Sequence, residues 1–259
     1  MTDAADDALV ARLRAAGCVY AEEEAALLSE AGSADAAGGL ESLVARRVAG
    51  EPLEQVLGWV GFCGLRVPVR RGLFVPRRRT ELLAEQARAL TPASGVVVEL
   101  CCGVGAISLV VLAGQADVEL HAADLDPAAV GCAADNLRGR ATVHQGDLFD
   151  ALPRGLSGRV DVLVANAPYV PTAAIALMPP EARQHEAAMA LDGGADGLDV
   201  LRRVVAGAPA WLAPGGRLLF ECSEQQVGPV TAFAAGVGLR SEVHRDPERA
   251  ATMVLAARA

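Results

Sequence analysis

Residues 96–106 read Val96-Val97-Val98-Glu99-Leu100-Cys101-Cys102-Gly103-Val104-Gly105-Ala106, and this stretch decides the fold. The short apolar run predicts a buried strand, and the two glycines let the backbone turn sharply into a helix. A strand, a glycine turn and a helix form the first unit of an α/β sheet. Ligands of such sheets lie beyond the carboxyl ends of the strands, so we expect a site beside Gly103 and Gly105.

The alternation of strands and helices continues toward the end of the chain. The pattern predicts strands at 96–100, 118–123, 142–145, 160–165 and 217–221, and helices at 80–90, 106–113, 127–138 and 198–212. Two final strands, 239–245 and 252–257, are too close together for a helical crossover and must form an antiparallel hairpin. This ending favours a Rossmann-like methyltransferase sheet over that of a dinucleotide dehydrogenase. Ser108, where a dehydrogenase fingerprint has its third glycine, points the same way.

The residues before this sheet show a different pattern. Amphipathic patterns predict helices at 7–16, 21–30 and 40–49, and short β-like runs predict strands at 59–62, 65–69 and 73–75. We therefore expect a mostly parallel seven-stranded sheet that ends in an antiparallel hairpin, preceded by a small helical domain. The predicted boundaries are 1–55 for the helical domain, 56–78 for a linking β-hairpin and 79–259 for the Rossmann-like domain.

Composition excludes several classes of protein. The net charge of −9 argues against a protein that coats duplex DNA by neutralising phosphates. The six cysteines and four histidines show no metal-ligand spacing, so no metal site is expected. The acidic start is not followed by a long apolar run, which predicts neither a signal peptide nor a membrane span. We expect a cytoplasmic monomer that does not bind nucleic acid directly.

Six arginines crowd the segment before the sheet. They are Arg66, Arg70, Arg71, Arg77, Arg78 and Arg79. The segment is either a solvated hairpin face or a docking patch for an acidic or RNA-bound partner, and the residues themselves do not choose between the two.

Acidic side chains stand at three successive strand ends. Glu99 can face the ammonium of an amino-acid-like ligand, Asp124 can accept both hydroxyls of a ribose, and Asp147 can accept a hydrogen from an adenine amine. Each carboxylate alone is ordinary, but the series follows one edge of the sheet, where S-adenosylmethionine would lie. The other candidate cofactor-binding residues are Cys101, Gly103, Gly105, Ala106, Leu125, Leu148, Phe149 and Asn166.

The residues Asn166-Ala167-Pro168-Tyr169 follow the predicted strand 160–165 and are the candidate catalytic residues. The Asn166 side-chain oxygen and the Ala167 carbonyl can each accept one hydrogen from a planar –NH2 group. Pro168 fixes the direction of that carbonyl, and the Tyr169 ring can lie against the flat face of an amide or base. Arg77 either closes over the substrate or is solvated. The candidate substrate-binding residues are Arg77, Asn166, Pro168 and Tyr169.

From about residue 51 the chain resembles the HemK/PrmC family of protein-glutamine methyltransferases. The resemblance rests on Glu51-Pro52, Leu57-Gly58, Phe62, Gly64-Leu65, Val75-Pro76-Arg77, Thr80-Glu81, the glycine turn, Asn166-Ala167-Pro168-Tyr169, His185-Glu186, Ala190-Leu191-Asp192-Gly193-Gly194-Ala195-Asp196-Gly197-Leu198, Leu212-Ala213-Pro214-Gly215-Gly216 and Glu221 with Gln225. It implies a methyltransferase that uses S-adenosylmethionine to methylate the side-chain amide nitrogen of a Gln. The implied substrate is a protein with an exposed Gln, such as a release factor with a Gly-Gly-Gln loop or a ribosomal protein, recruited by the helical domain.

Three positions depart from the family pattern. The usual Asn-Pro-Pro-Tyr has Ala167 at its second position, which keeps the backbone carbonyl acceptor. Arg79 stands where the family has an acid, near the expected substrate entrance. Cys222 stands where a Gly is usual after Glu221. The last two departures bear on the substrate.

Two alternatives to glutamine methylation stay open. The two hydrogen-bond acceptors at Asn166 and Ala167 suit any planar –NH2 group. The group that receives the methyl is therefore alternatively the amino group of an adenine base or of a small metabolite. A second alternative is a weakly catalytic cofactor-binding protein that acts through its N-terminal helices as an interaction module. The intact Asn166, Pro168 and Tyr169 count against the latter.

Overall fold

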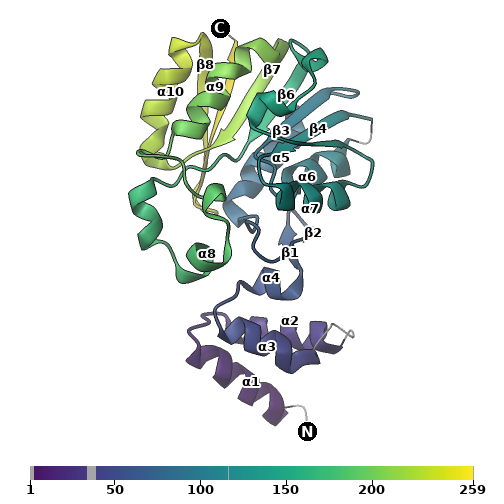
Figure 1. Ribbon diagram of the computed structural model, residues 1–259, viewed down its shortest axis with the longest axis vertical. Coiled ribbons are helices and arrows are strands. Elements are labelled where there is room, and N and C mark those ends of the chain that lie inside the picture. Colours follow the sequence, from purple (N-terminus) through teal and green to yellow (C-terminus); the bar gives the residue numbers. More distant parts are fainter. Residues whose placement is uncertain (1–2, 34–38, 116, 259) are drawn as a thin grey trace.

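The computed structural model describes residues 3–33, 39–115 and 117–258. Helices occupy one end of its long axis and a large sheet the other (Figure 1). The helices at the first end are α1 (Asp3–Ala15), α2 (Ala21–Ser33), α3 (Gly39–Val48) and α4 (Leu53–Leu57). They have a core of their own, in which Leu13, Leu28 and Val44 are buried. The three predicted helices are therefore present, and α4 is an additional one.

Strands β1 (Trp59–Phe62) and β2 (Leu65–Pro68) form the predicted antiparallel hairpin. Its inner side chains, including Phe62 and Val67, belong to the core on one face of the main sheet. The predicted strand at 73–75 is wrong, because this segment pairs with no strand. The backbone N–H of Val75 donates instead to the side chain of Glu186, at 3.3 Å.

The main sheet has seven strands in the order β5-β4-β3-β6-β7-β9-β8. The strands are β3 (Val96–Leu100), β4 (Glu119–Asp124), β5 (Thr142–Gln145), β6 (Val160–Ala165), β7 (Leu212–Glu221), β8 (Leu239–Asp246) and β9 (Ala251–Arg258). Neighbours from β5 to β7 run parallel, and β9 runs antiparallel to both β7 and β8. The predicted fold class is confirmed. Strand β7 begins at Leu212, five residues earlier than predicted (217).

Helices cover both faces of this sheet (Figure 1). One face carries α5 (Glu81–Leu90), α6 (Ala106–Gly114) and α7 (Pro127–Leu137), and the other carries α9 (Asp199–Trp211) and α10 (Val227–Gly236). Successive residues of a strand point to opposite faces, so Val97 packs under the first layer whereas Val96 and Val98 pack under the second. Covering on both faces explains why β3 is buried at every position.

Helix α10 was not predicted from the sequence. It contains Gly228 and Pro229 near its start, and both residues are weak helix formers. Its buried Val230 and Ala234 pack in the core of the second face, and this tertiary packing stabilises the helix.

The chain between β6 and α9 is built from short helical turns. They are η4 (Thr172–Leu177), α8 (Pro180–His185) and η5 (Ala188–Ala190). Further 3₁₀ turns are η1 (Arg78–Thr80), η2 (Leu148–Ala151), η3 (Arg154–Leu156) and η6 (Glu224–Gln226). Among the helices of the described residues, none is both long and apolar enough to cross a bilayer.

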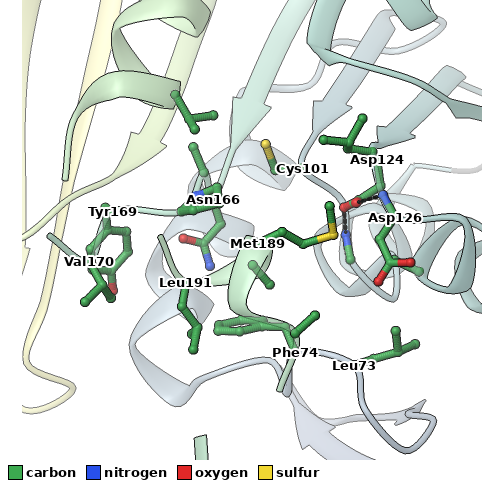
Figure 2. A pocket seen from close by; sticks show the side chains of 18 of the residues that line it. Leu73, Phe74, Cys101, Asp124, Asp126, Asn166, Tyr169, Val170, Met189 and Leu191 are labelled. Carbon is green, nitrogen blue, oxygen red and sulfur yellow. Dashed lines mark hydrogen bonds between the residues drawn. The ribbon is translucent and has the colours of Figure 1, made fainter. Parts of the chain in front are cut away.

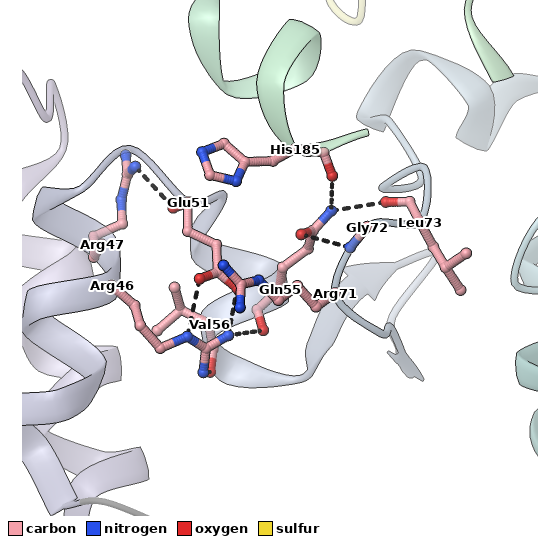
Figure 3. Close-up of polar contacts among 9 residues, drawn as sticks. All are labelled: Arg46, Arg47, Glu51, Gln55, Val56, Arg71, Gly72, Leu73 and His185. Carbon is pink, nitrogen blue, oxygen red and sulfur yellow. Dashed lines mark hydrogen bonds and ion pairs between the residues drawn. The ribbon is translucent and has the colours of Figure 1, made fainter. Parts of the chain in front are cut away.

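Gln55 of α4 connects three segments that are distant in sequence (Figure 3). Its Nε2 donates to the carbonyl oxygens of Leu73, at 2.8 Å, and His185, at 3.1 Å. Its Oε1 accepts from the backbone N–H of Gly72, at 3.1 Å. The buried amide therefore fixes the helical end of the molecule to the loop after β2 and to the end of α8.

Candidate active site

A cavity opens at the carboxyl ends of the parallel strands (Figure 2). Parallel strands end on the same edge of a sheet, which brings residues of β3, β4, β5 and β6 together although they are distant in sequence. In Figure 2, Asn166 lies between Tyr169 on one side and Asp124 on the other. We call the part near Asp124 the cofactor half and the part near Asn166 the acceptor half.

Asp124 ends β4 and lines the cofactor half. Its Oδ2 accepts a hydrogen bond from the backbone N–H of Gly103, at 2.8 Å, and its Oδ1 accepts one from that of Asp126, at 2.9 Å. Burial raises the pKa of this carboxyl, and the two backbone donors act against that rise. Each carboxylate oxygen has a second lone pair, so Asp124 can still accept hydrogens from ligand hydroxyls.

The two glycines of the turn, Gly103 and Gly105, have different roles. Gly103 lines the cavity at φ +53°, and a Cβ placed on it would meet no protein atom within 4 Å. Gly105 lies outside the cavity lining, and a Cβ there would come within 3.3 Å of Leu137. Gly103 therefore keeps space open for a ligand, whereas Gly105 lets α6 approach α7. Cys101 also lines the cavity, whereas Ala106 is buried and does not line it.

Glu99 is buried beneath the turn and does not line the cavity. Its Oε2 accepts from the backbone N–H of Ser108, at 2.9 Å, and from the hydroxyl of the same residue. Burial raises the pKa of Glu99 to about 7, although both bonds from Ser108 act to lower it. The side chain predicted to face a ligand ammonium instead fixes the first turn of α6.

Apolar side chains complete the cofactor half. Leu125 and Leu148 line it, and Asp147 lies at its edge in an ion pair with Arg203, at 2.8 Å. Phe149 lies outside this cavity, because its ring stacks on Trp211 with the ring centroids 5.4 Å apart. Leu148 and Phe149 are the two residues predicted to pack on the adenine ring. Leu148 lines the cavity, and Phe149 does not.

These residues fit the nucleoside part of S-adenosylmethionine. A carboxylate with spare lone pairs suits ribose hydroxyls, leucine side chains suit a base, and Gly103 leaves room close to the backbone. Within the described residues, no group of three or more His, Cys, Asp or Glu side chains is arranged to hold a metal ion.

Asn166 follows β6 and lines the acceptor half together with Ala167 and Pro168. Its Nδ2 donates to the hydroxyl of Thr80, at 3.3 Å. Within the described part of the chain, no hydrogen bond ends on Asn166 Oδ1. Thr80 thus engages the amide nitrogen and leaves the amide oxygen available to a ligand.

Tyr169 is fixed by two neighbours. Its hydroxyl donates to Oε1 of Glu221 at 2.7 Å, and Nε of Arg79 donates to the same oxygen at 3.1 Å. The Arg79 guanidinium also lies 5.7 Å from the centroid of the Tyr169 ring. Burial, with Glu221 nearby, raises the pKa of the Tyr169 phenol, which therefore keeps its proton and acts as a donor.

A run of glycines supports the acceptor half from behind. A Cβ on Gly193 would come within 2.7 Å of the Pro168 carbonyl oxygen, and one on Gly197 within 2.2 Å of the Tyr169 carbonyl oxygen. Gln226 donates to that Tyr169 oxygen at 2.9 Å. The segment from Gly193 to Gly197 therefore serves as a close-fitting backbone support for residues 168–169.

Arg77 lines the cavity and pairs with Glu186, at 2.5 Å between Nη2 and Oε1. The Glu186 side chain is fully buried, so this pair holds the loop before α5 against the segment after α8. Burial raises the pKa of Glu186 although Arg77 acts to lower it. Arg77 is thus neither simply solvated nor free to swing over the cavity.

The other arginines of this segment are also mostly paired. Arg66, Arg70 and Arg71 pair with Glu30, Asp135 and Glu51. Arg78 is exposed and makes no ion pair with any described residue. Because most of these arginines are paired with acidic side chains, the segment is better interpreted as a solvated face than as a docking patch for an acidic or RNA-bound partner.

The candidate site residues predicted from the sequence leave out Thr80 and Glu221, and Arg79 appears only as a departure from the family pattern near the expected substrate entrance. Thr80 and Glu221 do belong to the motifs that carried the family resemblance, and those motifs were the available signal. Their contacts with Asn166 and Tyr169 bridge 86 and 52 residues of sequence.

Known proteins that resemble this chain are methyltransferases. Residues 78–235 match the family model described as methyltransferase small domain. The chain is 36% identical over 199 residues to a release factor glutamine methyltransferase of Geobacter sulfurreducens, covering 76% of this chain and 69% of the relative. It is 34% identical over 212 residues to the 4-amino-L-phenylalanine/4-methylamino-L-phenylalanine methyltransferase of Streptomyces pristinaespiralis, covering 79% and 72%.

Among solved structures, a methyltransferase of Pyrococcus furiosus is similar, with a TM-score of 0.57 at 13% identity. The match covers 82% of this chain and 95% of the other, and it supports the fold. The family predicted from the sequence motifs is confirmed by these relatives. The chain belongs to the HemK/PrmC family of protein-glutamine methyltransferases and is an S-adenosylmethionine-dependent methyltransferase.

Proposed function

We propose that this protein methylates the side-chain amide nitrogen of a glutamine in a protein substrate, and that the substrate is a release factor. The observation that carries the proposal is the pair of acceptors in the acceptor half, Asn166 Oδ1 and the carbonyl of Ala167. Relatives such as that of Geobacter sulfurreducens, named as release factor glutamine methyltransferases, support the same substrate class.

The acceptor half suits a weak nitrogen nucleophile. S-adenosylmethionine supplies an electrophilic methyl group on a sulfonium when it is bound. Asn166 Oδ1 and the Ala167 carbonyl would accept the two N–H hydrogens of the substrate amide, hold its nitrogen in line and stabilise the positive charge that builds up there. The Tyr169 ring would pack on the amide plane and exclude water. No general base is needed before attack, since the nitrogen loses its proton readily once methylated.

We further propose the cofactor-binding residues from the lining of the cofactor half. Gly103, Asp124, Leu125 and Leu148 would hold the nucleoside, with Asp124 accepting the ribose hydroxyls. Glu99, Gly105 and Ala106 would act by shaping the turn, and Phe149 by packing against the core that contains Leu148.

The division at 1–55, 56–78 and 79–259 also belongs to the proposal. The helices of the first part have a separate core, which is consistent with a recruiting domain that engages the substrate outside the cavity. A release-factor substrate would make the cytoplasm the place of reaction.

Transfer of labelled methyl groups tests the proposal. Purified protein and labelled S-adenosylmethionine would be incubated with a release factor, and the labelled residue identified by mass spectrometry. We expect label on the glutamine of the Gly-Gly-Gln loop. Replacing Asn166 with Ala should lower kcat by about 100-fold, because one acceptor of the amide is lost. An unlabelled glutamine in the presence of bound cofactor would refute the proposal.

One observation favours a second acceptor, the aromatic amine of an amino acid. The relative from Streptomyces pristinaespiralis is named for such a substrate, and the grip at Asn166 suits any planar –NH2 group. Methyl transfer to 4-amino-L-phenylalanine, with none to the release factor, would select this function.

A further inference from the structure

Arg79 presents a fixed positive charge to the acceptor half. Its side chain is 42% exposed and lines the cavity, whereas its partner Glu221 is only 3% exposed. The carboxylate of Glu221 is therefore buried outside the cavity lining. Of this ion pair, only the Arg79 guanidinium lines the cavity.

The guanidinium has donors to spare. Nε is occupied by Glu221, at 3.1 Å, and neither Nη1 nor Nη2 donates a hydrogen bond within the described part of the chain. The contact with the Tyr169 ring, 5.7 Å from the guanidinium carbon to the ring centroid, limits how the group can turn. A pre-oriented pair of N–H donors matches the two oxygens of a carboxylate.

The Arg79 guanidinium lies next to the residues that are proposed to bind the acceptor nitrogen. Arg79 precedes Thr80, whose hydroxyl accepts from Asn166 Nδ2 at 3.3 Å, and the Arg79 guanidinium lies 5.7 Å from the centroid of the Tyr169 ring. A carboxylate bound by Arg79 would thus belong to the same molecule as the acceptor nitrogen.

We propose that Arg79 forms a carboxylate subsite, so that the preferred acceptor carries a carboxylate close to the methylated nitrogen. This inference rests on the proposed function only in that a planar nitrogen binds at Asn166. The carboxylate has two sources: an acidic side chain beside a glutamine of a protein, or the α-carboxylate of a free amino acid.

Binding of two matched ligand pairs tests the proposal and separates the sources. The first pair is a capped peptide whose glutamine is flanked on both sides by Glu, and the same peptide with Met in place of Glu. The second pair is 4-amino-L-phenylalanine and its carboxamide. Calorimetry in the presence of S-adenosylhomocysteine gives each Kd without turnover, and methyl transfer is measured in parallel.

We expect the carboxylate member of one pair to bind about tenfold more tightly than its neutral partner. Arg79→Gln should reduce that preference to within about twofold. Arg78→Gln is the matched control, since Arg78 is the adjacent arginine, is exposed and does not line the cavity; the preference should survive there. The double variant Arg79→Gln with Glu221→Gln removes both charges, so it tests the subsite without leaving a buried carboxylate unpaired.

The outcomes distinguish this proposal from the proposed function. Equal or unmeasurable binding within both pairs, or a preference that survives in both Arg79 variants, overturns the subsite. Methyl transfer to glutamine without any carboxylate preference leaves the proposed function standing and the subsite refuted. A carboxylate preference confined to the amino-acid pair, lost with Arg79, supports the subsite and argues against glutamine as the acceptor.

Discussion

Thr80 decides which end of the Asn166 amide faces the cavity. The buried hydroxyl of Thr80 accepts from Nδ2 at 3.3 Å, which leaves Oδ1 for a substrate. An amide without that partner could rotate and offer a donor where the proposed mechanism needs an acceptor. Thr80 is therefore a positioning residue for the proposed reaction.

Replacing Thr80 with Val keeps the shape of the side chain and removes the hydroxyl. We expect kcat to fall about tenfold with little change in the affinity for S-adenosylmethionine, because one orienting hydrogen bond is lost. Thr80→Ser retains the hydroxyl and should recover most of the activity. Steady-state kinetics of the three proteins check this, and equal loss in the Ser and Val variants would contradict a positioning role.

At the scale of elements, the junction of β3 and α6 contains a buried titratable group. Burial raises the pKa of Glu99 from its ordinary value of 4.5 to about 7. The native state therefore holds the proton over a pH range in which the unfolded chain has released it. The stability this provides is complete below about pH 4.5 and is lost as the pH rises to about 7.

Glu99→Gln should remove this dependence. A pKa difference of this size corresponds to about 3 kcal/mol, so the wild-type free energy of unfolding should fall by up to that amount between pH 4.5 and pH 7 relative to the variant. Urea unfolding at a series of pH values measures the difference. Parallel pH profiles for the two proteins would show that Glu99 does not titrate in this range.

The turn before α9 depends on a glycine at position 197. Gly197 has φ +78°, and an added Cβ would come within 2.2 Å of the Tyr169 carbonyl oxygen. Gly197→Ala should therefore destabilise the protein by about 2 kcal/mol and lower its activity by displacing Tyr169. Gly228→Ala in α10 is the control, since a Cβ there meets nothing within 4 Å. Thermal unfolding and methyl transfer on both variants check the prediction, which fails if Gly197→Ala behaves like the control.

At the scale of the whole molecule, Arg47 joins the helical end to the sheet end. Its side chain, 9% exposed, pairs with the buried Glu24 of α2 and with Glu181 of α8. Arg46 pairs with Glu51. Gln55 of α4 donates to the carbonyl oxygens of Leu73 and His185 (Figure 3). Polar contacts of a few buried side chains therefore hold the two ends together.

Arg47→Met should destabilise the protein by about 3 kcal/mol, because it leaves the Glu24 carboxylate buried without a partner. Adding Glu24→Met should recover a large part of that loss, since no buried charge is then left unpaired; Glu181, the other partner of Arg47, is 46% exposed. Urea unfolding of the single and double variants gives both numbers. A double variant no more stable than Arg47→Met would mean that packing, and not charge, accounts for the effect.

Local patterns in the sequence determined much of this protein. The apolar runs and the glycine turn located β3 to β6, the short spacing of the last two strands required their hairpin, and Asn166-Ala167-Pro168-Tyr169 located the acceptor half. These features depend on residues that are close in sequence, and the physics of strands, turns and planar acceptors acts at that range.

Only the tertiary structure decided which side chains meet. Thr80 and Asn166 are 86 residues apart, and Arg79 and Glu221 are 142 apart, so their pairing depends on the order of strands in the sheet. The burial of Glu99 beneath Ser108 and the turning of Phe149 toward Trp211 follow from the packing of α6 and α9 on that sheet. Strand order and helix packing are set by the burial of the whole core, which no local pattern encodes.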